Sequence, residues 1–440
     1  MAQNWQTNLI HSNAKVPGGF RALSVPVERA STVVFPDCES AVGGWDVEAN
    51  GYTYGIHGTP TVLTLAGRIA ELEGGARTLL VPSGLAALTL VDMAMLSAGS
   101  HVLIPDNVYV PNRLLAVKLL HRFGVEASFY PADAGAAVAE YFRSNTHLIW
   151  VESPGSITME VQDVPAIAAA THAHGAIVAM DNTWAAGVLF KAFAHGVDIS
   201  VQALTKYVGG HSDLLLGSVT IRDEALLQRL GETRARLGLS VSPDECSLAL
   251  RGLQTLAVRM HHAEASALTI ANWISARPEV QTVLHPALEG CPGHEFWKRD
   301  FTGASGLFSF IFRQEFSGTQ VRAFVDALDL FKIGYSWAGT TSLAVAYDLN
   351  HSRGASPYGD RLVRLSIGME DTDDLIADLK QALERMQAAR LSIANQGDSI
   401  RSAEWHTSWT IDGILRVSKP DESGPQSIVI GRKGKGEQNG

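Results

Sequence analysis

The sequence has few cysteines, no long apolar run and no excess of basic residues. Its three cysteines, Cys38, Cys246 and Cys291, lie far apart and lack the spacing of zinc or redox motifs. We therefore expect no disulfide framework, no metal site and a reducing, cytoplasmic location. No apolar run approaches the roughly 18 residues that span a bilayer. The N-terminus lacks the features of a signal peptide. A formal net charge of −10 argues against nucleic acids and acidic membranes as partners.

The length and composition are those of a globular protein with more than one lobe. The chain has 440 residues, of which 46% are hydrophobic and 18% are charged. A single core rarely grows beyond about 250–300 residues, so two or three lobes are expected. Residues 1–60 show little periodicity and are predicted to form an extended arm. A helix is predicted to begin near Thr59 and Pro60 and to end at Gly74.

Residues 61–250 alternate between short apolar runs and helical segments, such as the one predicted over residues 113–123. Near-continuous apolar strands separated by helices are typical of a mostly parallel sheet that is covered on both faces. Ligands of such sheets bind beyond the carboxyl ends of the strands. The residues found at those predicted ends are Ser83-Gly84, Asp106-Asn107, Glu152-Ser153, Asp181-Asn182 and Lys206.

The pattern changes after about residue 250. A long helix over residues 247–276 leads to strands over 306–312 and 361–368, and then to a helix over 371–389. These elements predict a smaller α+β domain over residues 251–392. Residues 393–440 are polar and form a tail of unknown role, although "SIVIG" at 427–431 could add a strand.

Lys206 follows the apolar run "DISVQAL" and precedes Gly209-Gly210. Burial of an amine is costly unless the amine is paired or used chemically, and it lowers the pKa so that the neutral, nucleophilic form becomes available. A salt bridge at the solvent-exposed end of the strand explains a single lysine there equally well. The sequence around Lys206 alone leaves both interpretations open.

Two further features follow predicted strands. Asp181 ends "AIVAMD", where it can cap a turn or pair with a protonated ring nitrogen. Ser83-Gly84 joins a strand to a helix, where free N–H groups and the helix dipole can bind a phosphate. Together a lysine, an acid and a phosphate cradle at one sheet edge predict pyridoxal phosphate bound to Lys206.

Longer segments resemble the Cys/Met-metabolism family of pyridoxal-phosphate enzymes of fold type I, and within it the bacterial cystathionine β-lyases. Together with weaker matches they cover about residues 5 to 390. The resemblance implies an aspartate-aminotransferase-like large domain with a mostly parallel seven-stranded sheet, over residues 61–250, and the smaller domain after it. The matching segments are "ESPGSITMEVQDVPAI", "DNTWAAGVLFKA", "QALTKYVGGHSD", "GHEFWKRDFTGASGLFSF", "YSWAGTTSL" and "LVRLSIGMEDTDDLIADL".

The same resemblance implies roles at the cofactor. Lys206 forms the Schiff base and moves protons, and Asp181 pairs with the pyridine nitrogen. Tyr109 stacks on the ring and takes part in catalysis. The phosphate is expected to contact the backbone N–H groups of Gly84 and Leu85 and the hydroxyl of Thr205.

The resemblance also implies which residues contact the substrate and which reach the neighbouring subunit. Arg364 is expected to bind the substrate α-carboxylate, with Ser336 and Trp337 in a loop that meets the same group. The resemblance also implies that Ser156 lies beside the substrate and that Tyr54 reaches the neighbouring subunit's site from the arm, where it contacts the cofactor and takes part in catalysis. His57 is a candidate cofactor-binding residue.

The sequence departs from the family pattern at several of these places. Ile56 stands where the family has an arginine for the partner's cofactor phosphate, and His57 beside it is an incomplete replacement. Thr341, Ser247 and Leu114 stand where the β-lyases have a glutamate, a tyrosine and an acid. These changes concern the substrate pocket.

The resemblance implies a carbon–sulfur β-lyase that converts the amino acid L-cystathionine to homocysteine, pyruvate and ammonia. A γ-lyase, a γ-replacement enzyme or an amino-acid racemase on the same scaffold is an alternative, as is a catalytically reduced binding protein. A homotetramer built from dimers that share active sites is also implied.

Overall fold

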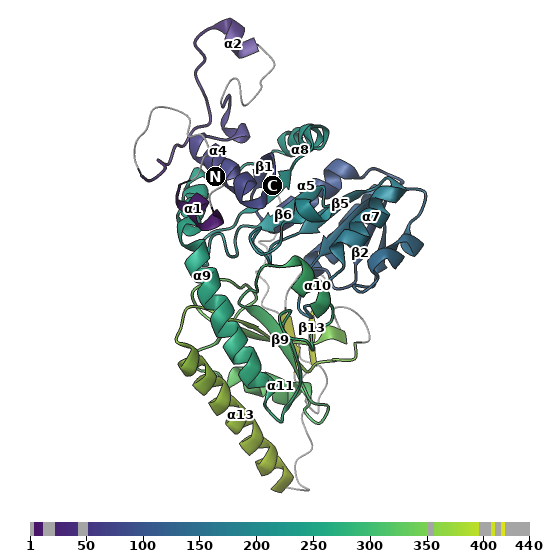
Figure 1. Cartoon of the computed structure of the whole chain (residues 1–440), viewed down its shortest axis with the longest axis vertical. Coiled ribbons are helices and arrows are strands. Elements are labelled where there is room, and N and C mark those ends of the chain that lie inside the picture. The colour runs from purple at the N-terminus through teal and green to yellow at the C-terminus, as the bar shows by residue number, and fades with distance from the viewer. Residues whose placement is uncertain are drawn as a thin grey trace, which may run out of the picture. The chain divides into compact units, whose positions relative to one another are not determined.

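The computed structural model describes residues 4–11, 23–42, 52–350, 356–395, 406–409 and 415–418. The chain divides into two compact units, Met1–Met386 and Gln387–Gly440. The first unit contains two sheets joined by the long helix α9 (Pro243–Ser275), which runs from one to the other (Figure 1). In the second unit, β13 (His406–Trp409) pairs with β14 (Leu415–Ser418). The strand considered at 427–431 lies outside the described residues.

The larger sheet has seven strands in the order β1-β7-β6-β5-β4-β2-β3. All of its strands run parallel except β7, which is antiparallel to both of its neighbours. The predicted mostly parallel seven-stranded sheet is therefore confirmed. Its strands are β1 (Arg77–Val81), β2 (His101–Pro105), β3 (Glu126–Tyr130), β4 (Thr146–Glu152), β5 (Ile177–Asp181), β6 (Ile199–Ala203) and β7 (Gly217–Ile221).

Helices cover both faces of this sheet. Successive side chains of a strand point to opposite faces, so neighbouring residues of one strand pack against different helices. In β4, Leu148 and Trp150 pack with α5 (Gly84–Met95) and α8 (Glu224–Arg236). Ile149 and Val151 pack with α4 (Pro60–Glu73) and α7 (Val164–His174) on the other face. This double covering explains the near-continuous apolar strands of the sequence.

Two predicted helices of this part differ in detail. Helix α4 begins at Pro60 and ends at Gly74, which has a φ of 74°, as predicted, but the Thr59 side chain makes no capping hydrogen bond. The helix predicted over residues 113–123 is broken. It consists of α6 (Val110–Leu114), a π-helical segment (Leu115–Leu119) and a 3₁₀ turn (Leu120–Phe123).

The smaller sheet has the strand order β10-β11-β12-β9-β8. Aromatic side chains of β9, Phe308, Phe310 and Phe312, form its core with Phe324. The helices and strands predicted here from periodicity are confirmed, while the domain boundaries stay predictions. The elements are β8 (Val280–Leu284), α10 (His294–Asp300), β9 (Leu307–Phe312), α11 (Gly318–Asp326), β10 (Lys332–Ile333), β11 (Leu343–Tyr347), β12 (Leu362–Ser366) and α13 (Thr372–Asn395).

The N-terminal segment contains short helices in the part that the structure describes. Helix α1 (Trp5–Ile10) buries Leu9 and contacts α4 and α9. Helix α2 (Cys38–Val42) buries no side chain. The turn η1 (Gly55–His57) lies directly before α4.

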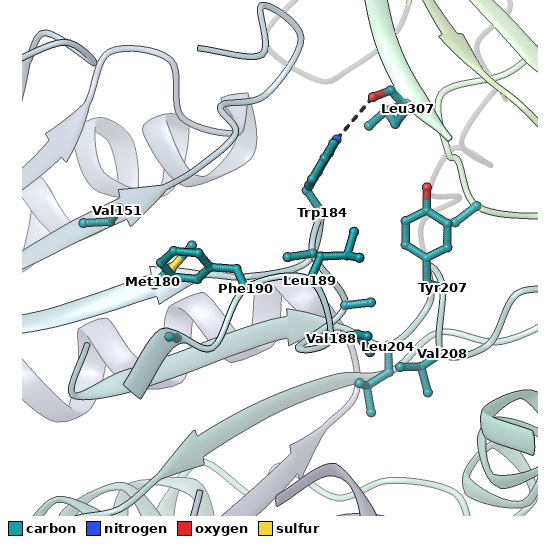
Figure 2. Packing of buried hydrophobic residues seen from close by; sticks show 14 of the residues in the cluster. Val151, Met180, Trp184, Val188, Leu189, Phe190, Leu204, Tyr207, Val208 and Leu307 are labelled. Atoms are coloured by element: carbon teal, nitrogen blue, oxygen red, sulfur yellow. Dashed lines mark hydrogen bonds between the residues drawn. The ribbon is translucent and has the colours of Figure 1, made fainter. Parts of the chain in front are cut away.

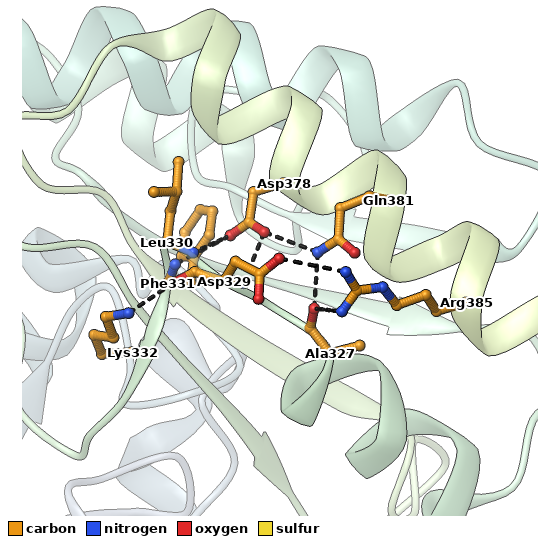
Figure 3. A network of polar contacts seen from close by, with 8 residues as sticks. All are labelled: Ala327, Asp329, Leu330, Phe331, Lys332, Asp378, Gln381 and Arg385. Atoms are coloured by element: carbon orange, nitrogen blue, oxygen red, sulfur yellow. Dashed lines mark hydrogen bonds and ion pairs between the residues drawn. The ribbon is translucent and has the colours of Figure 1, made fainter.

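A polar network ties α13 to the loop before β10 (Figure 3). The buried carboxylate of Asp378 accepts hydrogen bonds from the backbone N–H groups of Asp329 and Leu330, both at 2.8 Å, and of Phe331 at 3.1 Å. Gln381 donates a further bond at 2.9 Å. Burial alone would raise the pKa of Asp378, but these donors together hold it below its ordinary value.

Replacement of Asp378 by alanine is expected to lower the free energy of unfolding by about 3 kcal/mol, because three backbone N–H groups lose their acceptor. The pKa of Asp378 is depressed on folding, so this stabilisation is present above about pH 4 and is lost as the pH falls through the folded value. Urea unfolding of both proteins at neutral and acidic pH measures the difference. Asp374→Ala, at an exposed position of the same helix, should cost less than about 1 kcal/mol.

Candidate functional site

The carboxyl ends of the parallel strands bring the predicted site residues to one edge of the sheet. Glu152, the last residue of β4, pairs in register with Asp181, the last residue of β5. Strand β6 ends at Ala203, and Lys206 follows in the next turn. The segments that follow β5 and β6 pack against each other in one apolar cluster that includes Phe190 and Leu204 (Figure 2). Asp181 and Lys206 therefore have a rigid support.

The turn that carries Lys206 is held from helix α9. Arg259 donates to the carbonyl of Tyr207 at 2.7 Å and to that of Gly252 at 2.8 Å. Gly210 has a φ of +72°, and a Cβ there would lie 2.0 Å from Arg259 Nη1. Only glycine fits this position, which explains the second glycine after the lysine.

The amine of Lys206 faces the smaller sheet's loop. Its Nζ donates to Ser336 Oγ at 2.9 Å and lies 5.4 Å from the centroid of the Trp337 ring. Burial and the charge of Arg364 lower the pKa of Lys206 to about 8, although Asp181 opposes the shift. A substantial neutral fraction therefore exists near neutral pH, as a nucleophilic amine requires.

Lys206 of the cofactor-free protein is expected to react with aldehydes with a midpoint near pH 8, because only the neutral amine attacks a carbonyl. Below that pH its reaction should fall about tenfold per pH unit. Reductive methylation over a range of pH, followed by mass spectrometry of the peptide, measures the midpoint. The peptide with the exposed Lys380 is the internal reference. A midpoint equal to that of Lys380 would contradict this expectation.

Asp181 is held by one of its two oxygens. The backbone N–H of Thr183 donates to Asp181 Oδ1 at 3.0 Å, and the Thr183 hydroxyl donates to the same atom. Within the described ranges, Oδ2 accepts no hydrogen bond from the protein. Burial raises the pKa of Asp181, while Thr183 and the charge of Lys206 oppose that shift. A cationic N–H donor at Oδ2 would satisfy this carboxylate.

Arg364 is a buried cation on β12, with 7% of its surface exposed. Its Nη2 donates to the carbonyls of Tyr335 at 2.8 Å and Ser336 at 3.4 Å, and its guanidinium lies 5.3 Å from the Tyr347 ring centroid. Among the residues placed by the structure, no carboxylate forms an ion pair with it. Burial accordingly lowers its pKa. A buried guanidinium without a counter-ion fits the carboxylate of a ligand.

The predicted phosphate cradle is the start of α5. Ser83 caps this helix by accepting from the N–H of Ala86 at 3.1 Å, and the N–H groups of the first turn, which include Gly84 and Leu85, have no intrahelical acceptor. A Cβ on Gly84 would meet the Ala203 Cβ at 2.6 Å, so glycine allows the helix start to approach β6 closely. An anion is stabilised at such a helix end.

Thr205, the predicted hydroxyl donor to the phosphate, is already hydrogen-bonded. Its Oγ1 donates to the carbonyl of Leu216 at 3.2 Å and accepts from the N–H of the same residue at 3.0 Å. The hydroxyl must therefore rotate away from Leu216 to donate to a ligand.

Tyr109 and Ser156 lie near the same edge. The N–H of Tyr109 donates to Glu152 at 2.7 Å. Burial, followed by the charges of Asp181 and Glu152, raises the pKa of Tyr109, although 43% of the residue is exposed. The N–H of Ser156 donates to the carbonyl of Asn107 at 2.9 Å, so this loop packs on the segment before Tyr109.

Tyr54 and His57 stand apart from this group within one chain. Tyr54 is 49% exposed and forms a β-bridge with Thr32. Arg234 of α8 donates to the carbonyls of Ile56 at 3.2 Å and His57 at 3.5 Å. Burial and the charge of Arg234 lower the pKa of His57. The turn is held by Arg234 and by the segment before it, because the N–H of Gly55 also donates to the carbonyl of Ser31 at 2.8 Å.

Two residues at the site were not found from the sequence. Thr183 follows Asp181 by two positions, the spacing at which a short side chain folds back on a carboxylate. Arg259 lies in a helix more than fifty residues after the turn that it holds. The double glycine was the only sequence signal that some group approaches the Lys206 turn closely.

The residues present fit pyridoxal phosphate. The aldehyde of this cofactor requires an amine of lowered pKa, its ring nitrogen an acid, and its phosphate a set of N–H donors. Lys206, Asp181 with its available Oδ2, and the start of α5 supply groups of these kinds. A second anion, the carboxylate of an amino acid, matches Arg364.

Comparison with known proteins agrees with this arrangement. The crystal structure of metB from Corynebacterium glutamicum superimposes with a TM-score of 0.81 at 29% identity, over 87% of this chain and 98% of that one. Cystathionine β-lyase MetC of Escherichia coli is 41% identical over 388 residues, 86% of this chain and 98% of its own. An L-alanine/L-glutamate racemase of Wolbachia pipientis is 39% identical over 378 residues, 83% of this chain and 93% of its own.

The fold is that of the pyridoxal-phosphate-dependent enzymes with a large α/β domain and a smaller sheet domain. The pattern of the Cys/Met metabolism PLP-dependent enzymes matches residues 6–384. The chain belongs to this family, and its cofactor is pyridoxal phosphate. Both predictions made from the sequence are confirmed.

None of the helices that the structure describes has the combination of length and apolar character needed to cross a bilayer. No group of three or more histidine, cysteine, aspartate or glutamate side chains in the described ranges could hold a metal ion.

Proposed function

We propose that the protein is a carbon–sulfur β-lyase that converts L-cystathionine to homocysteine, pyruvate and ammonia. The observation that carries this proposal is that Lys206 and Arg364 both bond Ser336, at 2.9 and 3.4 Å, in a chain 41% identical to a cystathionine β-lyase. When bound, pyridoxal phosphate supplies an electron sink conjugated to the α-carbon of an amino acid.

Arg364 binds and orients the amino acid in this proposal. Its planar guanidinium can bind the α-carboxylate through two parallel hydrogen bonds. Nη2 donates to the carbonyls of Tyr335 and Ser336, while Nη1 donates to no acceptor among the described residues and is available to the ligand. Ser336 lies between this guanidinium and Lys206, because its carbonyl accepts from Arg364 and its hydroxyl accepts from Lys206.

Lys206 is the base that removes the proton from the α-carbon. Its lowered pKa suits transfer in both directions near neutral pH. Asp181 would stabilise positive charge on the ring nitrogen through Oδ2, and Tyr109 is the residue that the family resemblance assigns to stacking on the ring. The departing thiolate needs a proton, which Lys206 or Tyr109 can donate.

An amino-acid racemase is the second candidate, and the 39% identity with an L-alanine/L-glutamate racemase favours it. Racemisation requires only removal and return of the α-proton, so the same Lys206 and Arg364 serve both reactions. The side chain decides between them: a β-thiolate can depart, whereas the methyl group of alanine cannot.

A substrate panel tests the function. The holoenzyme is incubated with L-cystathionine, L-cysteine, L-methionine, an O-acylated L-homoserine and L-alanine, and the products are separated. We expect pyruvate, ammonia and homocysteine from cystathionine at the highest kcat/KM. 2-Oxobutyrate as the main product indicates γ-elimination, and D-alanine without pyruvate indicates a racemase; either result would contradict the proposal.

We also propose a cytoplasmic homotetramer in which Tyr54 and His57 complete the partner's site. The exposed ring of Tyr54 and the exposed apolar side chains Leu114, Val117 and Phe123 support burial in an interface. Sedimentation velocity is expected to give one species of four chains. A monomer with full lyase activity would contradict shared sites. The three free cysteines, two of them buried, support a reducing location.

A further inference from the structure

The hydroxyl of Thr183 continues the pairing of β5 and β6 beyond the last residue of β5. The N–H of Asn182 donates to the carbonyl of Val201 at 2.8 Å, as in a regular parallel ladder. The next N–H on β6, that of Ala203, donates to Thr183 Oγ1 at 2.9 Å instead of a carbonyl. The Thr183 hydroxyl thus takes the place of a backbone carbonyl as the acceptor at the end of the β5–β6 pairing.

The direction of this hydrogen bond fixes the proton of the hydroxyl. The backbone N–H of Ala203 can only donate, so Thr183 Oγ1 accepts there and is free to donate its own hydrogen. The described acceptor for that hydrogen is Asp181 Oδ1, which also accepts the N–H of Thr183 at 3.0 Å. Both bonds fall on Oδ1 and favour the ionised carboxylate, which leaves Oδ2 available.

The peptide of Ala203 connects the same hydroxyl to the lysine turn. Its N–H donates to Thr183, and its carbonyl accepts from the N–H of Lys206 at 3.1 Å. Thr183 is 8% exposed and its neighbour Asn182 is fully buried, with Nδ2 donating to the carbonyl of Phe190 at 3.1 Å. Trp184 and Leu204, the neighbours of Thr183 and Ala203 in the chain, belong to the buried apolar cluster shown in Figure 2. The position of the hydroxyl is therefore well determined.

We propose that Thr183 is a positioning residue, whose hydroxyl holds the Asp181 carboxylate with Oδ2 towards the cofactor ring and keeps the Lys206 turn in register with it. This inference rests on the proposed pairing of Asp181 with the ring nitrogen. It adds a link between the two residues, through a side chain that bonds Asp181 and the N–H of Ala203.

Thr183→Val tests this role, because valine keeps the shape and removes the hydroxyl. Titration of the cofactor-free protein with pyridoxal phosphate is expected to show affinity reduced about 10- to 100-fold. The visible absorbance of the bound cofactor should also change with pH at a shifted midpoint. Thr183→Ser restores the hydroxyl and should bind within about threefold of the original protein.

The chain offers a matched control in Thr78 of β1. Thr78 is also 8% exposed, and its hydroxyl bonds that of Thr220 at 2.8 Å within the same sheet, away from Asp181. Thr78→Val should lower thermal stability and leave the cofactor affinity and the absorbance midpoint unchanged. Equal loss of affinity in Thr78→Val and Thr183→Val would reduce Thr183 to a structural role and overturn the inference.

Asp181→Asn separates this inference from the assignment on which it rests. If Asp181→Asn weakens cofactor binding but Thr183→Val does not, the positioning role is wrong and the pairing stands. If neither variant alters affinity or absorbance, the pairing is wrong, and the role of Thr183 fails with it. Loss in both variants with recovery in Thr183→Ser supports the inference.

Discussion

Lys206→Ala is expected to lower kcat by about 10⁴-fold or more and to remove the visible absorbance of the bound cofactor. The amine is the proposed covalent anchor and the proposed base, so one substitution removes both functions. Lys206→Arg should fare no better, because a guanidinium stays protonated and cannot attack a carbonyl. Steady-state kinetics with cystathionine and an absorbance spectrum of the same samples measure both effects.

Lys191 provides the control for this variant. Its amine is also partly buried in the large domain, with a lowered pKa caused by burial, but it donates to the carbonyls of Leu72 and Gly187, both at 2.8 Å. Lys191→Ala should lose stability while it retains the absorbance band and most of its turnover. Full turnover in Lys206→Ala would refute the anchor, whatever Lys191→Ala does.

Arg364→Met is expected to lower kcat/KM for cystathionine by about 10³-fold, mainly through KM. Loss of a buried partner for a carboxylate costs about 2–5 kcal/mol, which corresponds to this range. Arg364→Lys should recover little of the loss, because an ammonium cannot form two parallel bonds. Visible absorbance of the cofactor should stay, since Arg364 is assigned to the substrate.

A substrate analogue without the α-carboxylate supplies the control. The original enzyme should convert this analogue slowly, and Arg364→Met should convert it at a similar rate, because neither reaction has the bond between Arg364 and an α-carboxylate. The same substitution should raise the midpoint of thermal unfolding of the cofactor-free protein, since a buried guanidinium without a counter-ion is removed. If Arg364→Met were much slower than the original enzyme on this analogue, Arg364 would have a role other than binding the α-carboxylate.

The sequence located the strand ends well, but it did not predict the order of the strands in the sheet. Apolar runs that end in Asp181 and shortly before Lys206 follow from burial of both sheet faces, so their common edge was predictable. The reversal of β7 was not, because a buried antiparallel strand has the same apolar composition as a parallel one. The break after Leu114 in the helix expected over residues 113–123 also left no clear periodic signal.

The site was predictable where a residue type has one main use and unpredictable where its role depends on a distant neighbour. A lysine and an aspartate at strand ends indicated the cofactor, and the family assignment confirmed it. The role of Arg364 in binding an amino acid was implied by the family resemblance alone. Thr183 and Arg259 act through backbone groups of other elements, which a sequence pattern does not show. The individual roles at the site remain predictions.

The sequence has Ile56 where the family has an arginine, and the structure shows what holds this position. The carbonyl of Ile56, rather than its side chain, has a charged contact, because Arg234 donates to it at 3.2 Å. Arg234 therefore fixes the turn that contains Tyr54 and His57, whatever that turn meets in a partner.

Reduction of the holoenzyme with borohydride, followed by peptide mass spectrometry, tests the central claim most directly. The method converts a labile bond between cofactor and amine into a stable one. The account predicts that the mass of the reduced cofactor is found on Lys206 and on no other lysine. A cofactor on a different lysine, or a bound cofactor that is attached to none, would contradict it.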